Sequence, residues 1–263
     1  MRFVLILPFA AMFACSPAPV PPSPVATVTI TDPMSFLAQS PENAGRHDWP
    51  LPVGYVALAN IRETDARARQ SWDFAPFGSY EPERGDGFQV AEVGADRYVR
   101  FTSTRDGGTP WVQHFVGHHC GGSGWIVFGQ DAPTGSWREV VATLSIAQDL
   151  ATCPPSLNPA FTRYRLEQVD YPFAVAGVRS TRTIPTVISE HYDHATIAQA
   201  GALERSYLGQ GYGLLRWEAW RRSPPSIPDL PERCGPLAWS EAPQPGWHLR
   251  DCRSYTNVVT VTP

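Results

Sequence analysis

Lysine is absent from this chain of 263 residues, and its 21 basic side chains are all arginines. The 25 acidic residues outnumber them, which gives a formal net charge of −4. A protein without a positive field does not attract nucleic acid electrostatically. We therefore expect no nucleic-acid partner.

Three motifs with known chemistry are missing as well. The sequence has no glycine-rich phosphate loop, no GxSxG turn and no HExxH helix. These absences argue against nucleotide binding, an α/β-hydrolase and a zinc protease of the HExxH type. We expect no cofactor.

Charged residues make up only 17% of the chain, whereas there are 27 prolines and 21 glycines. This composition suits many short strands joined by turns, and it is unlike that of a helical bundle. Turn residues such as Asp106-Gly107-Gly108 separate short apolar runs at fairly regular spacing, which is typical of an antiparallel sandwich or barrel. We predict a mostly-β fold, an antiparallel β-sandwich of the jelly-roll or concanavalin-like type. Among its strands we expect Gly87–Val93, Tyr98–Thr104, Trp111–Val116, Trp125–Gly129 and Phe161–Val169, the second and third forming a hairpin.

One short helix is predicted near residues 194–204. Asp193 is placed to cap it, and Ile197, Ala200 and Leu203 would fall near one face. The segment Glu139–Leu150 is compatible with either helix or strand.

The N-terminus has the pattern of an export signal. Arg2 precedes Phe3–Met12, an apolar run too short to span a bilayer. The small residue Ala14 and the following Cys15 resemble the lipobox of bacterial lipoproteins, although Met12 and Phe13 depart from that motif. We expect lipidation at Cys15, and the alternative is ordinary cleavage that leaves a free thiol.

These features divide the chain into three parts. Residues 1–14 are the predicted signal peptide, and residues 15–26 are the lipidated cysteine followed by a proline-rich tether. Residues 27–263 form one predicted sandwich domain. Ser16 after the cysteine is typical of outer-membrane lipoproteins, so we expect an exported protein that contacts the membrane only through its lipid anchor.

Four further cysteines predict two disulfides in an exported protein. Three pairings are possible, and we favour Cys120–Cys153 and Cys234–Cys252 because each closes a local loop. Each disulfide would stabilise the fold by about 3 kcal/mol. Metal ligation is a weaker alternative, since no CxxC pair is present.

A histidine cluster invites a metal interpretation. His114, His118 and His119 precede Cys120, and His191 and His194 could add ligands. Adjacent histidines point in opposite directions on a strand, and Cys120 is expected to be oxidised. We therefore predict a polar loop beside a disulfide and no metal.

Two predicted strands, Thr186–Tyr192 and Gly213–Trp220, hold the densest mixture of charged and aromatic side chains. Residues two apart share a face, so Glu190 would lie beside Tyr192, and Glu218 would lie between Arg216 and Trp220. Two carboxylates facing one cleft are what a glycosidase needs. The alternative is that each carboxylate pairs with an arginine.

The same strands also suit a polysaccharide lyase. His191 or Tyr192 would abstract a proton, while Arg216 and Gln113 would neutralise the uronate carboxylate. Val112-Gln113-His114 and Tyr207–Tyr212 are similar to two short motifs of the alginate-lyase family and occur in the same order. The arginine-rich strand motif of that family has no counterpart here beyond Tyr98-Val99-Arg100.

Three classes of function follow. The first is a polysaccharide-degrading enzyme, hydrolase or lyase, and the second is a non-catalytic module that binds a glycan or another polar surface ligand. The third is a structural envelope lipoprotein, which predicts that Arg216, Glu218 and Trp220 are covered or paired internally. The candidate site residues are Glu190, His191, Tyr192, Arg216 and Glu218 for catalysis, and Gln113, His114, Tyr207 and Trp220 for substrate binding.

Overall fold

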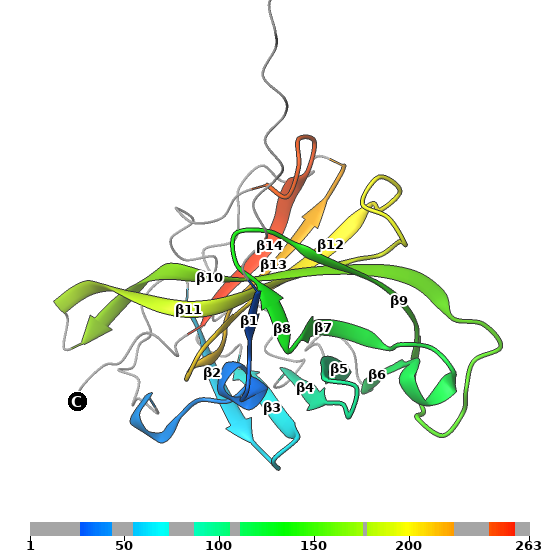
Figure 1. The fold of residues 1–263 in the computed structure, drawn as a ribbon, viewed down its shortest axis with the longest axis horizontal. Helices are drawn as coiled ribbons and strands as arrows, with labels where there is room; N and C mark the ends of the chain where they lie inside the picture. Colours follow the sequence, from blue (N-terminus) through cyan, green and yellow to red (C-terminus); the bar gives the residue numbers. More distant parts are fainter. Residues whose placement is uncertain are drawn as a thin grey trace, which may run out of the picture.

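Antiparallel β-strands dominate the computed structural model, which describes residues 27–43, 55–73, 87–105, 111–175, 178–223 and 242–255. Three short 3-10 helices, Pro33–Phe36, Pro41–Asn43 and His118–Cys120, accompany them. The strands are β1 Thr27–Thr29, β2 Tyr55–Arg62, β3 Arg67–Asp73, β4 Gly87–Val93, β5 Tyr98–Arg105, β6 Gln113–Val116, β7 Trp125–Gly129, β8 Asp131–Pro133, β9 Arg138–Ala147, β10 Asn158–Val175, β11 Val178–Tyr192, β12 Ala202–Gly209, β13 Gly213–Arg221 and β14 His248–Tyr255 (Figure 1).

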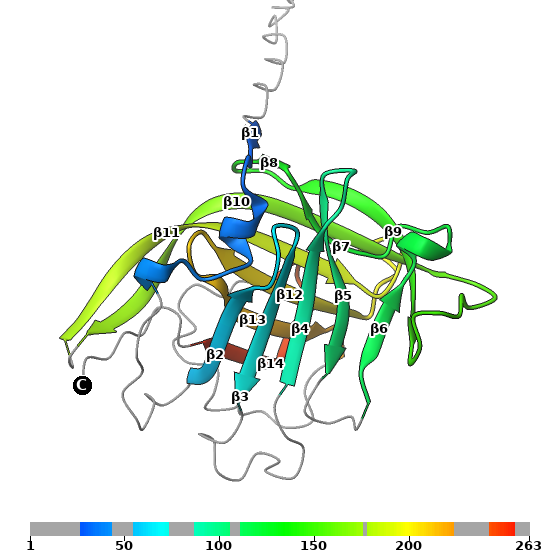
Figure 2. The same ribbon diagram turned by 90° about the horizontal axis from the view of Figure 1, so that it is seen from below.

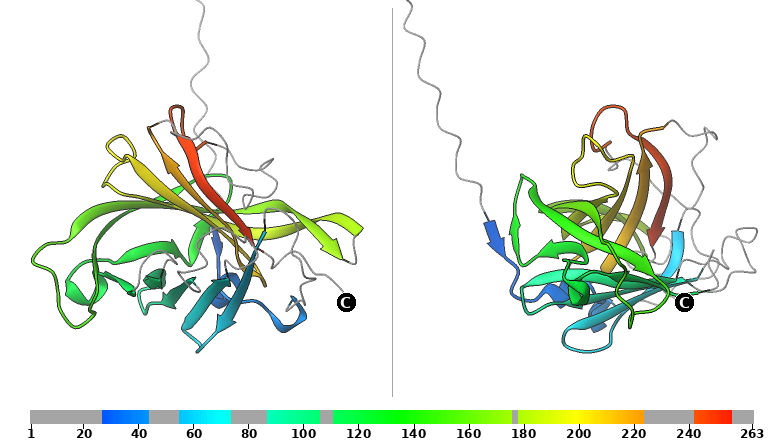
Figure 3. Two further views of the ribbon diagram at one scale, coloured as in Figure 1. Left: turned by 180° about the vertical axis from the view of Figure 1, so that it is seen from behind. Right: turned by 90° about the vertical axis from the view of Figure 1, so that its right-hand side faces the viewer.

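Twelve of these strands form one large sheet in the order β4-β3-β2-β14-β13-β12-β11-β10-β9-β6-β5-β7. β4 also pairs with β5, so the sheet nearly closes on itself. The pairing of β14 with β2 is parallel, whereas the other pairings within this sheet are antiparallel. β2 to β5 lie side by side in front of the long strands β10 to β13 in Figure 2 and below them in Figure 3.

The predicted all-β class is confirmed, and several strands have the expected limits. β4 and β7 begin and end as predicted, and β5 pairs with β6 as the predicted hairpin. The ambiguous segment Glu139–Leu150 is mostly strand β9, which pairs with β10 on one side and β6 on the other.

The predicted helix near 194–204 is wrong. Residues 193–201 form a turn between β11 and β12, and β12 begins at Ala202. Asp193 does bind backbone N–H groups with its side chain, but they belong to Gly201 and Ala202, at 3.0 and 3.1 Å from Oδ1. The carboxylate therefore closes a loop, as aspartate commonly does in turns, and does not start a helix.

Strands β10 to β14 have two distinct faces. Their inner face packs towards β7, where Thr162 and Ser189 donate hydrogen bonds to the carbonyl oxygens of Ile126 and Val127, at 2.8 and 2.6 Å. The largest apolar cluster fills this side and joins Phe128 to Val187 and Leu208. The outer face bears the alternate side chains, including Glu190.

The Cys120–Cys153 disulfide is formed as predicted. Cys252 is also disulfide-bonded, while its predicted partner Cys234 lies outside the described residues. Cys15, the predicted signal peptide and the tether lie outside them too. No helix in the part of the chain that the structure describes is long and apolar enough to cross a membrane.

Candidate functional site

Four charged residues stand directly opposite one another across four neighbouring strands of the outer face. Arg163 of β10 pairs in register with Glu190 of β11, Glu190 with Arg205 of β12, and Arg205 with Glu218 of β13. Directly opposed side chains on one face lie close enough to interact. The four residues form a row of alternating charge, which we call the charge ladder.

Glu190 is the most heavily bonded member of the ladder. Its Oε2 atom accepts hydrogen bonds from Arg163 Nε and from the Tyr192 hydroxyl, each at 2.5 Å. Its Oε1 atom accepts from Nε and Nη2 of Arg205, at 2.9 and 2.6 Å. Hydrogen bonds of this kind between ionised groups are about twice as strong as neutral ones.

Glu218 is held in a similar way. It accepts hydrogen bonds from Arg205 Nη1 at 3.2 Å, Arg216 Nε at 2.7 Å and Trp220 Nε1 at 2.9 Å. Arg216 also donates to Ser254 Oγ at 2.9 Å, so it ties β13 to β14. The row Arg216, Glu218 and Trp220 is therefore paired internally, which is what the structural class of function predicted.

The ladder and the neighbouring Arg216 are buried. Glu190, Glu218 and Arg216 have no exposed surface, and Arg205 is 5% exposed. Burial alone would raise the pKa of Glu190, but the guanidinium groups of Arg205 and Arg163 more than offset this and hold the pKa below its usual value. Burial and the neighbouring Glu190 carboxylate raise the pKa of Tyr192, so its phenol stays protonated.

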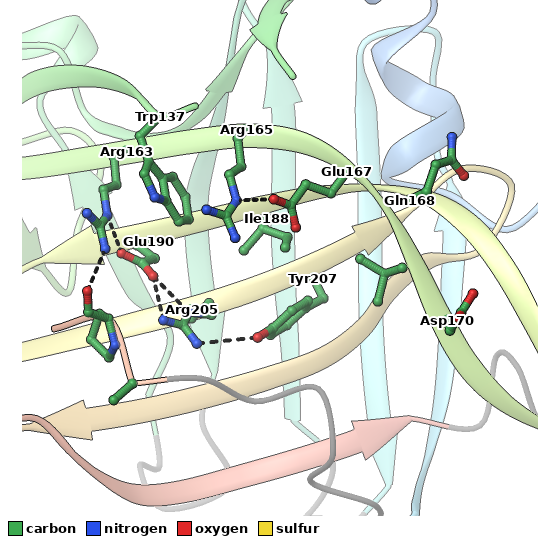
Figure 4. Close-up of a pocket in the computed structure, with 13 residues that line it drawn as sticks. Trp137, Arg163, Arg165, Glu167, Gln168, Asp170, Ile188, Glu190, Arg205 and Tyr207 are labelled. Atoms are coloured by element: carbon green, nitrogen blue, oxygen red, sulfur yellow. Dashed lines mark hydrogen bonds and ion pairs between the residues drawn. The ribbon is translucent and has the colours of Figure 1, made fainter. Parts of the chain in front are cut away.

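A cavity of about 340 Å³ opens beside the ladder on the outer face. The ring of Trp137 lies between two guanidinium groups, with Cζ of Arg163 at 4.4 Å and Cζ of Arg165 at 4.1 Å from the ring centre (Figure 4). Arg165 forms an ion pair with Glu167 at 2.8 Å, and both side chains are partly exposed. The remaining lining includes Gln168, Val169, Asp170, Ile188, Tyr207, Ala242 and Pro243.

The charges that line this cavity cancel. The lining contains three guanidinium groups, those of Arg163, Arg165 and Arg205, and three carboxylates, those of Glu167, Asp170 and Glu190. The cavity therefore offers many hydrogen-bonding groups, an indole and a phenol, but no excess of positive charge.

The structure separates the predicted site residues onto two faces. Tyr207 lines the outer cavity with Glu190, whereas Tyr192 and Trp220 are buried in an aromatic cluster with Trp247. Gln113 and His191 line cavities on the inner face. His114 is on β6 opposite Ser103, in a strand far along the sheet from β12. The two segments that resemble alginate-lyase motifs therefore do not meet at one site.

His191 is poorly suited to act as a base at the outer cavity. Its ring stacks on Trp125 with ring centres 4.2 Å apart, and Nδ1 lies 3.0 Å from Thr162 Oγ1. Burial lowers the pKa of His191 to about 3, so the ring is neutral near pH 7.

The histidine cluster does not present a full set of metal ligands among the described residues. His119 lies near Cys120 and Cys153, but the two sulfur atoms are bonded to each other and cannot act as thiolates. His119 Nε2 lies 3.0 Å from the carbonyl oxygen of Leu150.

Three important residues were missed from the sequence, namely Arg163, Arg205 and Trp137. Arg163, Arg165 and Glu167 alternate with Tyr164 and Leu166 in β10, so the period-two pattern could have placed these charges on one face. The contact of Arg163 with Glu190 could not have been foreseen, because it depends on which strands pair.

A comparison of the chain with protein-family models, curated proteins and solved structures found no match in any of the three. The function must therefore be argued from the geometry of the site.

Proposed function

We propose that this protein is an exported lipoprotein that binds a neutral glycan in the outer cavity and does not cleave it. The observation that carries the proposal is an open cavity with cancelling charges, built around Trp137 and its two stacked arginines. Three members of the charge ladder, Arg163, Glu190 and Arg205, line that cavity and serve as its rigid floor.

The contacts disfavour the polysaccharide-degrading alternative, whether hydrolase or lyase. A glycosidase needs a carboxylic acid that donates a proton, but Glu190 has a pKa below its usual value and four hydrogen bonds that favour the ionised form. A lyase needs a base such as Tyr192, but that phenol has a raised pKa and donates its proton to Glu190.

The charges favour a neutral ligand over an acidic one. An acidic sugar needs a guanidinium group to neutralise its carboxylate, whereas Arg216 is fully buried against Glu218, and Arg163 and Arg205 both bond Glu190. A neutral sugar needs donors and acceptors side by side, and Arg165 with Glu167 provides both at the partly exposed edge.

Stacking on the indole would also fix the ligand-binding groups before the ligand arrives. A guanidinium group lying over an aromatic ring keeps its planar set of N–H donors in one orientation. A site that is already ordered loses less conformational entropy on binding.

We further propose that the fold is a jelly-roll or related sandwich, and that a lipid on Cys15 anchors it to the outer membrane.

The test is a panel of immobilised neutral and uronate-containing polysaccharides, probed with the purified protein lacking its leader and tether. We expect retention on at least one neutral glycan and no retention that depends on uronate. Arg165→Ala should weaken retention by about ten- to a hundred-fold, because one charged hydrogen-bonding group is lost.

Two matched variants serve as controls. Arg69→Ala removes an exposed arginine that stacks on Phe88 at 4.3 Å, and Trp111→Ala removes a tryptophan that is 46% exposed. Both should bind as the unaltered protein does, whereas Trp137→Ala should not. Retention only on acidic glycans, or equal losses in the Arg69 and Arg165 variants, would overturn the proposal.

A further inference from the structure

The inner face of the sheet encloses a second site that is separate from the outer cavity. A cavity of about 390 Å³ and one of about 150 Å³ both lie on this face, and Trp125, Ile146 and Glu204 line both of them. A pocket of 300 Å³ or more is the usual size for a small-molecule site, and one of about 150 Å³ holds a benzene ring.

Aromatic side chains dominate the smaller, deeper cavity. It is lined by Trp72 of β3, Phe115 of β6, Trp125 of β7, Trp217 of β13 and Tyr255 of β14. Rings from five separate strands therefore surround one space. Aromatic surfaces of this kind favour a flat, apolar molecule that can stack or meet them edge to face.

Two unpartnered polar groups lie behind this wall and have no surface open to the cavity. Trp72 is 6% exposed, and its indole Nε1 has no hydrogen-bond partner among the described residues. Gln70 has no exposed surface, and neither its amide nitrogen nor its amide oxygen has a partner within that part of the chain. Gln70 stands directly opposite Gln89, which lines the deep cavity. Trp72 Nε1 lies against Gly87, and Gln70 lines neither cavity, so the aromatic rings and not these polar atoms would contact a ligand.

The charged groups that line the two cavities are engaged with protein. In the larger cavity, Asp193 accepts hydrogen bonds from the backbone of Gly201 and Ala202, and Arg221 donates to the carbonyl oxygen of Trp220. Glu204 accepts a hydrogen bond from Trp217 Nε1 at 2.9 Å, and the guanidinium group of Arg253 lies over the same indole at 4.8 Å. His191 in the larger cavity is neutral near pH 7. An uncharged ligand is therefore favoured.

We propose that the inner cavity binds an uncharged aromatic small molecule that stacks against the rings lining it. The ring occupies the deep compartment, and the rest of the molecule extends past Trp125 into the larger one. This site is independent of the proposed glycan site, because it lies on the opposite face of β10 to β14.

The test uses N-phenyl-1-naphthylamine, an uncharged aromatic dye that fluoresces in apolar surroundings. We expect saturable binding to the purified protein. Gln113→Trp places a large ring in the deep cavity and should abolish dye binding while circular dichroism and the unfolding transition show a folded protein. No saturable binding to the folded unaltered protein, or unchanged binding by folded Gln113→Trp, would overturn the proposal.

Discussion

The guanidinium group of Arg205 holds the carboxylate of Glu190 with two hydrogen bonds, from Nε at 2.9 Å and from Nη2 at 2.6 Å. The same guanidinium group reaches Glu218 at 3.2 Å on the other neighbouring strand. One buried cation therefore joins three adjacent strands. The stability of the outer face depends on it, because removing it would take a positive partner away from two buried carboxylates.

Arg205→Met should lower the free energy of unfolding by about 3–5 kcal/mol, since breaking a buried ion pair leaves uncompensated charge. Urea unfolding followed by circular dichroism measures this change. Arg67→Met is the matched control, because Arg67 pairs with Glu92 across strands while both side chains are more than 40% exposed. We expect that control to cost at most about 1 kcal/mol. Equal effects of the two substitutions would show that the ladder is not the buried network described above.

Stability should fall as the pH drops below 6.5, because of His191. The folded protein holds its pKa at about 3, whereas the unfolded chain has the ordinary value near 6.5. As pH falls, the unfolded chain therefore takes up a proton first. The stability that the neutral ring confers is complete above pH 6.5 and is lost progressively towards pH 3. Glu190 remains ionised in the upper part of this range, since its pKa lies below the usual value.

For the half-buried His191 ring we expect a loss of roughly 1–2 kcal/mol between pH 6.5 and pH 4.5. His191→Phe keeps the stacking on Trp125 and removes the titrating group, so it should flatten the profile over that range. Thermal or urea unfolding at a series of pH values measures both profiles. Parallel profiles for the two proteins would contradict the role given to His191.

The Cys120–Cys153 disulfide closes a loop of 33 residues. The chain-entropy relation gives about 3.7 kcal/mol for a loop of that length. Joint replacement of both cysteines by serine should lower the free energy of unfolding by roughly this amount. The outer cavity contains neither residue, so glycan retention at temperatures well below the unfolding transition should be unaffected.

Gly213, the first residue of β13, should not tolerate a side chain. Its φ is +74°, and an added Cβ would lie 2.5 Å from Asn60 Cγ, where the Asn60 amide donates to the carbonyl oxygen of Tyr212 at 2.6 Å. Gly135 is the matched control, since its φ is +71° and no atom lies within 4 Å of an added Cβ. Gly135→Ala should cost about 1 kcal/mol through backbone strain, and Gly213→Ala at least about 2 kcal/mol. Unfolding midpoints for both variants check the difference.

Local sequence patterns predicted where many of the strands lie, but they did not predict which side chains the neighbouring strands bring together. Period-two alternation placed Glu190 beside Tyr192 and Glu218 beside Trp220, because side-chain direction in a strand is a local property. It could not predict that Arg163 and Arg205 would flank Glu190, since pairing of β10, β11 and β12 is set by contacts between distant parts of the sheet. Whether the carboxylates face solvent or arginines therefore could not be read from β11 and β13 alone.

The helix predicted near residues 194–204 is absent for a comparable reason. The spacing of Ile197, Ala200 and Leu203 fits a helix, but Leu203 is instead buried as part of β12, opposite Tyr192. Asp193 is a good helix cap and an equally good turn residue, and the pairing of β11 with β12 decides between these roles. The sequence pattern around residue 193 cannot distinguish them.

The central claim is that the outer cavity binds a glycan without cleaving it. The most direct test is to incubate the protein with each polysaccharide of the panel and to measure reducing ends, unsaturated ends by ultraviolet absorbance, and the amount of intact glycan retained. We expect retention of a neutral glycan that stays intact over hours. New reducing or unsaturated ends that disappear with Glu190→Gln or Tyr192→Phe would contradict it and would identify an enzyme.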